Sequence, residues 1–517
     1  MKGKKIIAAI LGIVMCGSFL AGCSSKGAVS GPKTTDGKVD ASKKVDTSKE
    51  VNISLYLYGG EDVANKSILA ELNKNLKASI NTTLEVKYID WGDTNTKYPL
   101  LWTSGEQFDM SYVSPGAAVP YATLAKQDAL VDITGMIDTY APKLKTELSN
   151  KWNNVKVNGK IFAVPNNYSE YTAYGFVTRK DIMDKNNIKK ISSISDMETY
   201  MDAALKSGMV PLNGSSGLAM NLYRTLLGTT SDWIDAPGIP FSEMYLAANK
   251  NKPGNIFHPA FTDEFENFAV KMYEWAQKGY WPKDVLSSKQ NDKDNFYNGL
   301  SAAYISHQPD WTGNYGNQLK KLPGVDTEFY AFAEANGKFI KATGVGAATG
   351  ISKNSKNPER CLMVIEKLMT DKECYNLFQY GIQGKQYEIT DGKIAKPANF
   401  DAKIDGGGFS GWAFRTDKLN IPQKSEDPRR YTLNEAWSKV AIESPYIGFS
   451  FDSKSVSSQL SAIANVDSQL GIQILLGKTS QEPKKAVAEY RKQLKAAGVD
   501  EVVNAVKSQY SKFSENK

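Results

Sequence analysis

Histidine and cysteine are scarce in this sequence, and the scarcity limits the chemistry it can support. The 517 residues include only two histidines, His258 and His307, and four cysteines, two of which fall within the first 23 residues. The other two, Cys361 and Cys374, lie in apolar sequence of helical character, which favours buried, unpaired thiols. Zinc centres need three or four suitable ligands. We therefore expect no histidine- or cysteine-based metal centre and no cofactor.

A strongly basic surface and a nucleotide-binding loop are also missing. The net charge is +7 at pH 7, but three lysines lie in the first five residues, and residues 24–50 hold six lysines against four acids. The rest of the chain therefore carries a charge close to +2. Because nucleic-acid binding needs a concentrated basic face, we expect no nucleic-acid partner. The lack of a glycine-rich loop ending in Lys-Ser/Thr indicates no ATP site.

The first 50 residues have the character of an export leader followed by a tether. Three lysines precede an apolar run, residues 6–19, that is too short to span a bilayer. Leu20-Ala21-Gly22-Cys23 resembles the lipobox of bacterial lipoproteins, which implies a signal peptide at 1–22 and a lipid anchor, such as palmitate, on Cys23. Residues 23–50 would then be the lipidated cysteine and a flexible tether. This predicts a lipoprotein on the extracellular face of the cell membrane; a plain secretory signal is the alternative.

Strand-like and helix-like segments alternate from residue 51 onward. Apolar β-rich runs at 51–58, 83–89 and 108–113 are separated by segments with apolar residues at helical spacing. Such alternation predicts a parallel sheet, whose ligands lie beyond the carboxyl ends of the strands. Trp91, just past the second run, is either a ligand platform or a lid over the sheet edge. The candidate ligand-binding residues in these loops are Glu61, Asp62, Trp91 and Tyr112.

The segment 166–172 joins two short apolar runs of strand character, 160–164 and 173–177. Pro165 ends the first run, because proline cannot continue a sheet ladder in its middle. All seven residues of the segment are polar or aromatic, as expected where a chain crosses between domains beside a ligand. An ordinary hairpin loop is the alternative. The candidate ligand-binding residues of this crossover are Asn166, Tyr168, Glu170 and Tyr171.

Several motifs along the chain occur in a characteristic order. They are Ser104–Asp109, Asn158–Pro165, Asn298–Tyr304 and Gly350–Glu359. Their order and spacing resemble those of the family 1 extracellular solute-binding proteins, the lipid-anchored receptors of sugar ABC importers. Residues 444–452, Ser-Pro-Tyr-Ile-Gly-Phe-Ser-Phe-Asp, and the helical sequence after them resemble the C-terminal extension of the LipO-like subgroup.

The resemblance implies an α/β fold of the two-lobed, type II periplasmic-binding-protein kind. Each lobe would be a mostly parallel sheet flanked by helices, and a helical extension would follow at the C-terminus. Lobe 1 would comprise residues 51–165 and about 343–400. Lobe 2 would comprise about 166–342 and 401–517. The two lobes would close over a ligand held between them.

The remaining candidates are aromatic and polar residues in the loops of lobe 2 and beyond. Pyranose rings present apolar C–H faces and a rim of hydroxyls, so sugar sites combine flat aromatic rings with Asn, Gln, Asp, Glu or Arg. The family resemblance implies a platform role for Trp311, with Gln308 and Asp310 as hydroxyl partners. Further candidates are Asn213, Ser215, Trp233, Trp412 and Arg415.

These expectations converge on capture of a ligand rather than catalysis. The resemblance implies a monomeric substrate-binding protein, attached to the membrane only by its lipid, that delivers an oligosaccharide to ABC permease subunits. A receptor for peptides or other non-sugar solutes is one alternative. A cell-surface glycoside hydrolase is another, and it would need two carboxylates across the scissile bond, drawn from Asp62, Glu170 and Asp310.

Overall fold

The computed structural model describes residues 46–115, 117–169, 171–239, 244, 246–340, 346–449 and 451–515. The predicted leader, the predicted lipidation site Cys23 and the crossover candidate Glu170 lie outside these described residues. Within them, none of the helices combines the length and the apolar character that crossing a membrane requires.

The first lobe is built on a mixed five-stranded sheet with strand order β2-β1-β3-β13-β6. Strands β1 (Val51–Tyr58), β2 (Thr82–Ile89) and β3 (Met110–Val113) are parallel, as the alternating pattern predicts. Helix α1 (Asn65–Ile80) connects β1 to β2, and α2 (Thr94–Thr103) precedes β3. Strand β13 (Ala348–Ile351) returns from the second lobe and lies antiparallel to both β3 and β6 (Ala163–Pro165).

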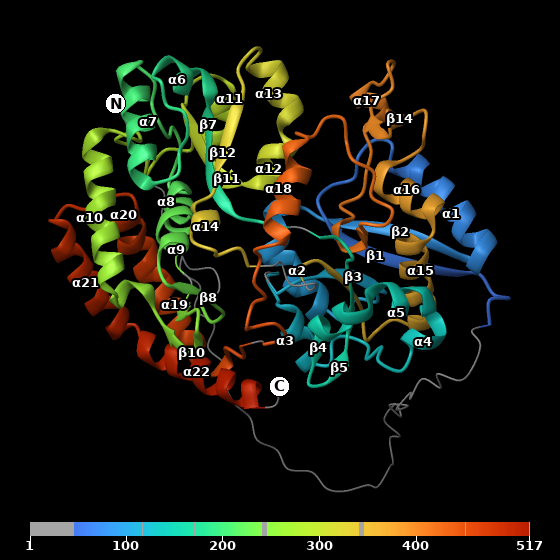
Figure 1. Cartoon of the computed structure of the whole chain (residues 1–517). Helices are drawn as coiled ribbons and strands as arrows, with labels where there is room; N and C mark the ends of the chain where they lie inside the picture. The colour runs from blue at the N-terminus through green and yellow to red at the C-terminus, as the bar shows by residue number, and fades with distance from the viewer. Residues whose placement is uncertain are drawn as a thin grey trace, which may run out of the picture. The chain divides into compact units, whose positions relative to one another are not determined.

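Helices and short hairpins surround this sheet (Figure 1). Their apolar side chains form one core with β1, α1 and β3, and that core includes Phe409 and Phe414. Residues beyond 400 thus still pack against the first core, through Phe414, and the lobe boundaries stay a prediction. Cys361 and Cys374 are buried in the same core as free thiols, as the sequence predicts. The surrounding elements are α3 (Tyr121–Lys126), α4 (Ile137–Tyr140), α5 (Pro142–Leu148), η2 (Ser149–Val155), β4 (Lys156–Val157), β5 (Lys160–Ile161), α15 (Pro358–Thr370), α16 (Lys372–Tyr380), β14 (Glu388–Thr390), β15 (Lys393–Ala395), α17 (Ala402–Asp405) and η5 (Trp412–Phe414).

The second lobe contains two three-stranded sheets. One has the order β11-β7-β12, with β7 (Tyr174–Arg179) between β11 (Ala303–His307) and β12 (Thr327–Tyr330). The other joins β8 (Trp233–Ala236), β9 (Leu246–Asn249) and β10 (Lys252–Phe257). All four pairings are antiparallel, unlike the mostly parallel sheet expected from the resemblance. Hydrophobic periodicity identifies a strand but does not encode its direction, which explains the difference.

The C-terminal segment shares one large core with much of the second lobe, and two smaller cores lie around Trp311 and Trp437. Phe265, Phe268, Met272 and Trp275 line the buried face of α10 (Asp263–Lys278). Figure 1 shows the C-terminal helices beside α10, which α20 and α21 contact directly. The other helices are α6 (Lys180–Lys185), α7 (Ile194–Lys206), α8 (Leu218–Leu222), η3 (Tyr223–Leu227), α9 (Gly228–Thr230), η4 (Pro259–Phe261), α11 (Asp292–Tyr297), α12 (Gln308–Gly313), α13 (Tyr315–Lys321), α14 (Phe332–Ala335), α18 (Arg429–Ser438), η6 (Lys454–Val456), α19 (Ser457–Val466), η7 (Asp467–Gly471), α20 (Ile472–Leu475), α21 (Pro483–Ala496) and α22 (Val499–Glu515).

Two chain segments that run between the cores of the two lobes, one around Asn167 and one around Thr416, are hydrogen-bonded to each other. Asn167 pairs in parallel with Thr416. The Asn167 N–H donates to the carbonyl of Arg415 at 2.8 Å, and the Asp417 N–H donates to the carbonyl of Asn167 at 3.0 Å. The segment 166–172 is therefore not an isolated hairpin loop, since it forms a two-stranded connection with the chain around Thr416.

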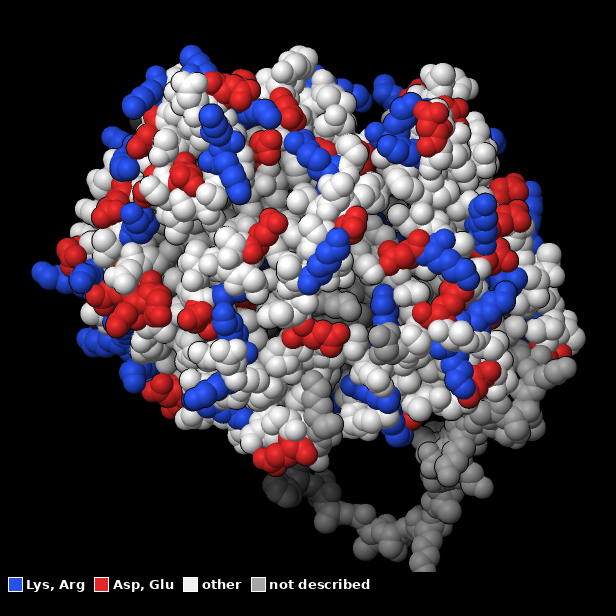
Figure 2. All heavy atoms as spheres, in the orientation of Figure 1, with Lys and Arg blue, Asp and Glu red and all other residues white. Residues whose placement is uncertain are grey.

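Basic and acidic side chains are interspersed over the face of the molecule drawn in Figure 2. Ion pairs of the protein include Lys418 with Glu147 at 2.6 Å and Lys160 with Asp132 at 2.9 Å. On that face, positive charge is not gathered into a single patch.

Candidate functional site

Four aromatic side chains gather at one edge of the first sheet, and we call them the aromatic cluster: Tyr58, Trp91, Tyr112 and Trp412. Tyr58 ends β1, Trp91 follows β2, and Tyr112 lies near the end of β3. Because these strands are parallel, their carboxyl ends meet at the same edge. Ring centroids are 5.6 Å apart for Tyr58 and Trp91, 5.1 Å for Tyr58 and Tyr112, and 5.4 Å for Trp91 and Trp412.

Local hydrogen bonds and close packing position the two tryptophans. Asp90 caps the short η1 turn (Trp91–Asp93) by accepting a bond from the Gly92 N–H at 2.9 Å. At Gly411, just before Trp412, a Cβ atom would come within 2.7 Å of Gln379 Nε2, which donates to the Gly411 carbonyl at 3.0 Å, so a larger residue there would displace the end of the Gln379 side chain. The result is an unusual exposure for a tryptophan, since 56% of the Trp91 surface is accessible to solvent while Trp412 is half-buried beside it.

The two tyrosines of the cluster differ in how their hydroxyls are used. Tyr112 donates a hydrogen bond to the carbonyl of Gly346 at 3.1 Å. The Tyr58 hydroxyl is buried and has no hydrogen-bond partner among the described residues. Burial raises the pKa of both tyrosines, so both stay neutral at physiological pH. The cluster thus offers flat, uncharged ring surfaces, which suit the apolar face of a ligand.

The polar candidates of the first lobe lie close to this cluster. Glu61 and Asp62 are exposed in the loop between β1 and α1. That loop begins at Gly59, whose φ of +120° favours glycine, and a Cβ there would lie 3.7 Å from Trp91 Nε1. Asn166 Nδ2 donates to the carbonyl of Trp412 at 3.3 Å, which connects the start of the crossover to the cluster.

Tyr168 and Arg415, two further candidates, contact each other at the paired crossover segments. The guanidinium of Arg415 lies over the Tyr168 ring, 5.5 Å from its centroid. Arg430, at the start of α18, donates to the Tyr168 hydroxyl at 2.8 Å. Tyr171, in the same segment, packs against the small core around Phe339 and Trp437 instead.

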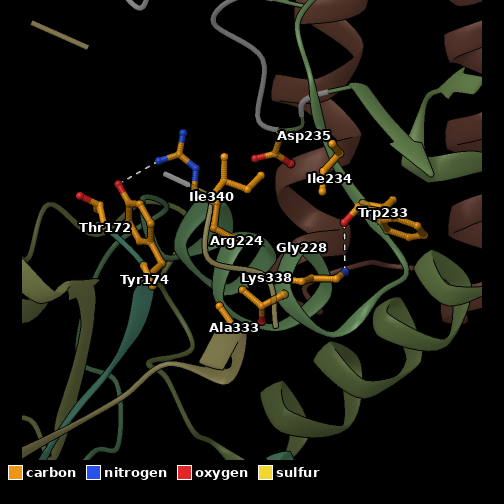
Figure 3. Close-up of a pocket in the computed structure, with 12 residues that line it drawn as sticks. Thr172, Tyr174, Arg224, Gly228, Trp233, Ile234, Asp235, Ala333, Lys338 and Ile340 are labelled. Carbon is orange, nitrogen blue, oxygen red and sulfur yellow. Dashed lines mark hydrogen bonds between the residues drawn. The ribbon is translucent and has the colours of Figure 1, made fainter. Parts of the chain in front are cut away.

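A cavity of about 370 Å³ lies in the second lobe, and we call it the lobe-2 cavity (Figure 3). The guanidinium of Arg224 lies over the Tyr174 ring at 5.0 Å, and its Nη1 donates to the Tyr174 hydroxyl at 3.0 Å. Lys338 Nζ donates to the carbonyl of Trp233 at 3.0 Å. The lining residues are Thr172, Ala173, Tyr174, Arg224, Gly228, Thr229, Trp233, Ile234, Asp235, Ala333, Lys338 and Ile340.

Burial shifts one of the charged groups in this cavity toward its neutral form, because it lowers the pKa of Lys338 to about 8. Asp235, by contrast, is exposed to solvent. Trp233, predicted as a site residue, is only 4% exposed, and its indole packs edge-on against Phe257 with the centroids 5.5 Å apart. It therefore contributes its backbone carbonyl, rather than an open ring face, to Lys338.

The structure places Trp311 in a core instead of at an open platform, which corrects the expectation from the sequence. Trp311 is 2% exposed, its Nε1 donates to Thr327 Oγ1 at 2.9 Å, and its ring stacks on Phe329 at 5.5 Å. The guanidinium of Arg429 also lies over the ring, at 4.7 Å. A sugar could stack on this ring only if Phe329 or Arg429 moved away from it.

The neighbours of Trp311 on α12 differ in how they are held. Asp310 Oδ1 accepts a bond from Lys293 Nζ at 3.0 Å, whereas Gln308 is fully buried and neither polar atom of its amide has a hydrogen-bond partner among the described residues. Of the three carboxylates named for the hydrolase alternative, Asp310 is ion-paired with Lys293 in the second lobe, Asp62 is exposed in the first, and Glu170 lies outside the described residues.

Asn213 and Ser215 lie in a loop anchored by its neighbours. Asn213 Nδ2 donates to the carbonyl of Leu300 at 3.2 Å, and Asn295 Nδ2 donates to the carbonyl of Asn213 at 2.8 Å. Neither Asn213 nor Ser215 lines the lobe-2 cavity. Among the residues that the structure describes, no group of histidine, cysteine and acidic side chains is arranged to hold a metal ion.

Sequence reasoning missed Tyr58, Arg224, Asp235 and Lys338. Tyr58 ends a strand in an apolar run, where a core role is the ordinary expectation. Arg224 is the single charged residue in the sequence of α8 and η3, and that isolation is the one signal that could have identified it.

Known proteins resemble the chain over most of its length. A relative from Streptococcus pneumoniae serotype 4, described as a carbohydrate ABC transporter substrate-binding protein, is 25% identical over 518 residues, covering 99% of this chain and 97% of its own. The N-glycan transport solute binding protein (NgtS) from Streptococcus pneumoniae has a TM-score of 0.74 at 23% identity, covering 90% of this chain and 100% of that chain. The alginate-binding protein AlgQ2 has a TM-score of 0.63 at 16% identity, covering 90% and 98%.

These structural likenesses show that the chain has the two-lobed, type II periplasmic-binding fold. Residues 445–515 match a domain of unknown function, DUF3502, and they coincide with the C-terminal extension predicted from the sequence. Residues 63–370, more than half of the chain, match the family described as bacterial extracellular solute-binding protein. The chain therefore belongs to the family of bacterial extracellular solute-binding proteins.

Proposed function

We propose that this protein captures a carbohydrate, an oligosaccharide, and delivers it to the permease of an ABC importer. The observation that carries the proposal is the aromatic cluster, in which the exposed ring of Trp91 lies beside Trp412 at the carboxyl edge of a parallel sheet. A stable protein gains little by leaving a tryptophan more than half exposed, whereas a sugar-binding protein needs such a surface.

The chemistry of the cluster suits a sugar better than a peptide terminus or an ion. A pyranose C–H face would stack on Trp91 and Trp412, and its hydroxyl rim would reach the carboxylates of Glu61 and Asp62. Asn166 would contribute from the crossover, where its side chain already contacts the carbonyl of Trp412. The names of the Streptococcus pneumoniae relatives, which concern carbohydrate and N-glycan transport, support the same ligand class.

Delivery requires that the ligand change the balance between two arrangements of the lobes. A ligand shifts such a balance only by the difference between its affinities for the two arrangements. The paired segments around Asn167 and Thr416 connect the cores and adjoin the cluster through Asn166. A sugar held at the cluster would therefore favour closure by contacting both a lobe and its connection.

The setting of this function follows from the N-terminal sequence. The lipobox-like Leu20–Cys23 supports removal of a signal peptide and attachment of the protein by lipid to the extracellular face of the membrane. Its partners would be the oligosaccharide and the permease subunits, and it would act as a monomer that binds without catalysing a reaction.

Isothermal calorimetry of the purified protein against a panel of neutral and acidic oligosaccharides, with short peptides as the comparison, tests the proposal. We expect at least one oligosaccharide to bind, and the peptides to give no heat. The same samples are then analysed by chromatography, where the saccharides should remain at their original length. Binding of peptides alone, or the appearance of shorter saccharides, would reject the proposed function.

A further inference from the structure

The lobe-2 cavity has the size and the charge distribution of a binding site, and nothing in the aromatic cluster accounts for it. Its volume of about 370 Å³ lies within the range of small-molecule pockets, about 300–1,000 Å³. Three of its lining residues are ionisable with opposite signs: Arg224 and Lys338 are basic, and Asp235 is acidic. The lining of the cavity therefore contains more basic side chains than acidic ones.

Arg224 is held in a defined orientation at this cavity. It belongs to the π-helical turn η3, a rare local structure that is frequent at functional sites. The stacking on Tyr174 and the bond to the Tyr174 hydroxyl fix the plane of its guanidinium. A guanidinium carries five N–H donors in a rigid fork that matches a carboxylate, so orientation in advance reduces the entropy lost on binding an acid.

The three ionisable groups lie around one space. Figure 3 shows the Arg224 guanidinium and the Asp235 carboxylate at one side of the cavity, with Lys338 extending to the carbonyl of Trp233 on the other. Lys338 is mostly protonated at neutral pH because burial lowers its pKa only to about 8. A ligand carboxylate between Arg224 and Lys338 would therefore meet two cations, while Asp235 would oppose it or accept bonds from hydroxyls beside it.

We propose that the lobe-2 cavity binds the carboxylate of an acidic sugar unit, such as a uronic or sialic acid, within the transported oligosaccharide. The inference rests on the proposed function and adds to it the charge class of the ligand. Arg224 provides the paired donors for the carboxylate, and Lys338 provides the second positive charge. Tyr174 acts as a positioning residue, because it holds the guanidinium in place.

Calorimetry with matched acidic and neutral monosaccharides tests this assignment. The probes are sodium D-glucuronate and sodium N-acetylneuraminate, with D-glucose as the uncharged counterpart of glucuronate. We expect at least one of the acids to bind more tightly than glucose, with an affinity that falls as salt is added. Affinities for both acids no higher than that for glucose, or no binding of either acid, would overturn the proposal.

Two substitutions should change the affinity for the acidic probe in opposite directions. Unfolding can only weaken binding, so the opposite signs separate an effect on the site from loss of the fold. Arg224→Gln should weaken binding of the acidic probe about tenfold or more, because a charge-assisted pair is lost. Asp235→Asn should strengthen it, because a like charge is removed at nearly constant shape. Lys320→Gln, an exposed change on α13, is the control that should leave affinity unaltered. Retained binding in Arg224→Gln, or weaker binding in Asp235→Asn, would overturn the assignment.

The outcome can be read independently of the general function. If neutral oligosaccharides bind and Trp91→Ala weakens their binding, while the acidic probes show no preference, then only the charge class proposed here is rejected. If no saccharide of any kind binds, the proposed function itself is rejected.

Discussion

The rings of Trp91 and Trp412 lie 5.4 Å apart between centroids, tilted by 47°, although one follows the second strand of the chain and the other follows the return from the second lobe. Two distant segments thus build a single aromatic surface. Trp91 stays open to solvent, while Trp412 joins the edge of the first core. Substitutions at the two positions should therefore have different consequences.

Trp91→Ala should weaken binding of a cognate oligosaccharide about tenfold, which corresponds to about 1.4 kcal/mol, and should change the free energy of unfolding only slightly. The reason is that an exposed ring contributes stacking to the ligand but little burial to the fold. Calorimetry and urea denaturation measure the two quantities. Leu319→Ala, which truncates an exposed apolar side chain on α13, is the control. An unaltered affinity in Trp91→Ala would remove that residue from the site.

Trp311→Ala should instead lower the free energy of unfolding by about 3–5 kcal/mol, the usual cost of removing a large aromatic ring from a core. Trp311→Phe should cost less, since it keeps most of the stacking on Phe329 while losing the bond to Thr327. Urea denaturation followed by circular dichroism measures both. A weaker affinity with unchanged stability would return Trp311 to the binding site.

Arg360→Met should destabilise the first lobe by about 3 kcal/mol, because it leaves several carbonyls without their charged donor. Arg360 is 3% exposed and donates to the carbonyl of Ile80 and to Thr82 Oγ1 at the end of α1. It also donates to the carbonyl of Asp46 at 2.6 Å, before β1 begins. Lys372→Met, an exposed change on α16, is the comparison in thermal unfolding. Equal melting temperatures for the two variants would contradict this role.

His258 should make the protein less stable as the pH falls from about 6.5 toward 3. Burial lowers its folded-state pKa from 6.5 to about 3, and its Nδ1 accepts a bond from the Ala260 N–H at 3.2 Å. Between these pH values the unfolded chain binds a proton that the folded chain does not, so stability decreases by up to about 1.4 kcal/mol per pH unit from this group.

The substitution His258→Asn tests that contribution, because asparagine keeps an acceptor for the Ala260 N–H but does not titrate. Unfolding free energies measured across the window should fall less steeply in the variant than in the wild type. Parallel curves for the two proteins would show that His258 does not contribute to the acid sensitivity.

The sheet of the first lobe could be predicted because its pattern is local. Apolar runs separated by helical spacing identify β1, β2 and β3, and Trp91 and Tyr112 follow from where those strands end. That Trp412 meets Trp91 could not be predicted, because the contact depends on how the chain returns from the second lobe. The spacing of apolar residues in either segment gives no indication of its contact with the other segment.

The second lobe resisted prediction for related reasons. His307 caps α12 by accepting the Asp310 N–H at 3.2 Å, and the short helix that begins there turns the Trp311 indole inward toward Thr327. The sequence around Trp311 suggests an open loop, so it does not indicate that the indole points inward. Arg224, Asp235 and Lys338 come from separate segments, so only tertiary structure places them around one cavity.

Trp91 also makes the protein its own optical reporter. Of the nine tryptophans in the chain, all of them described, it is the only one that is mostly exposed. A water-borne quencher such as iodide would reach this indole well before the buried ones. The fraction of tryptophan fluorescence that a saccharide protects from the quencher would then measure the occupancy of the binding site, without a dye or an attached label.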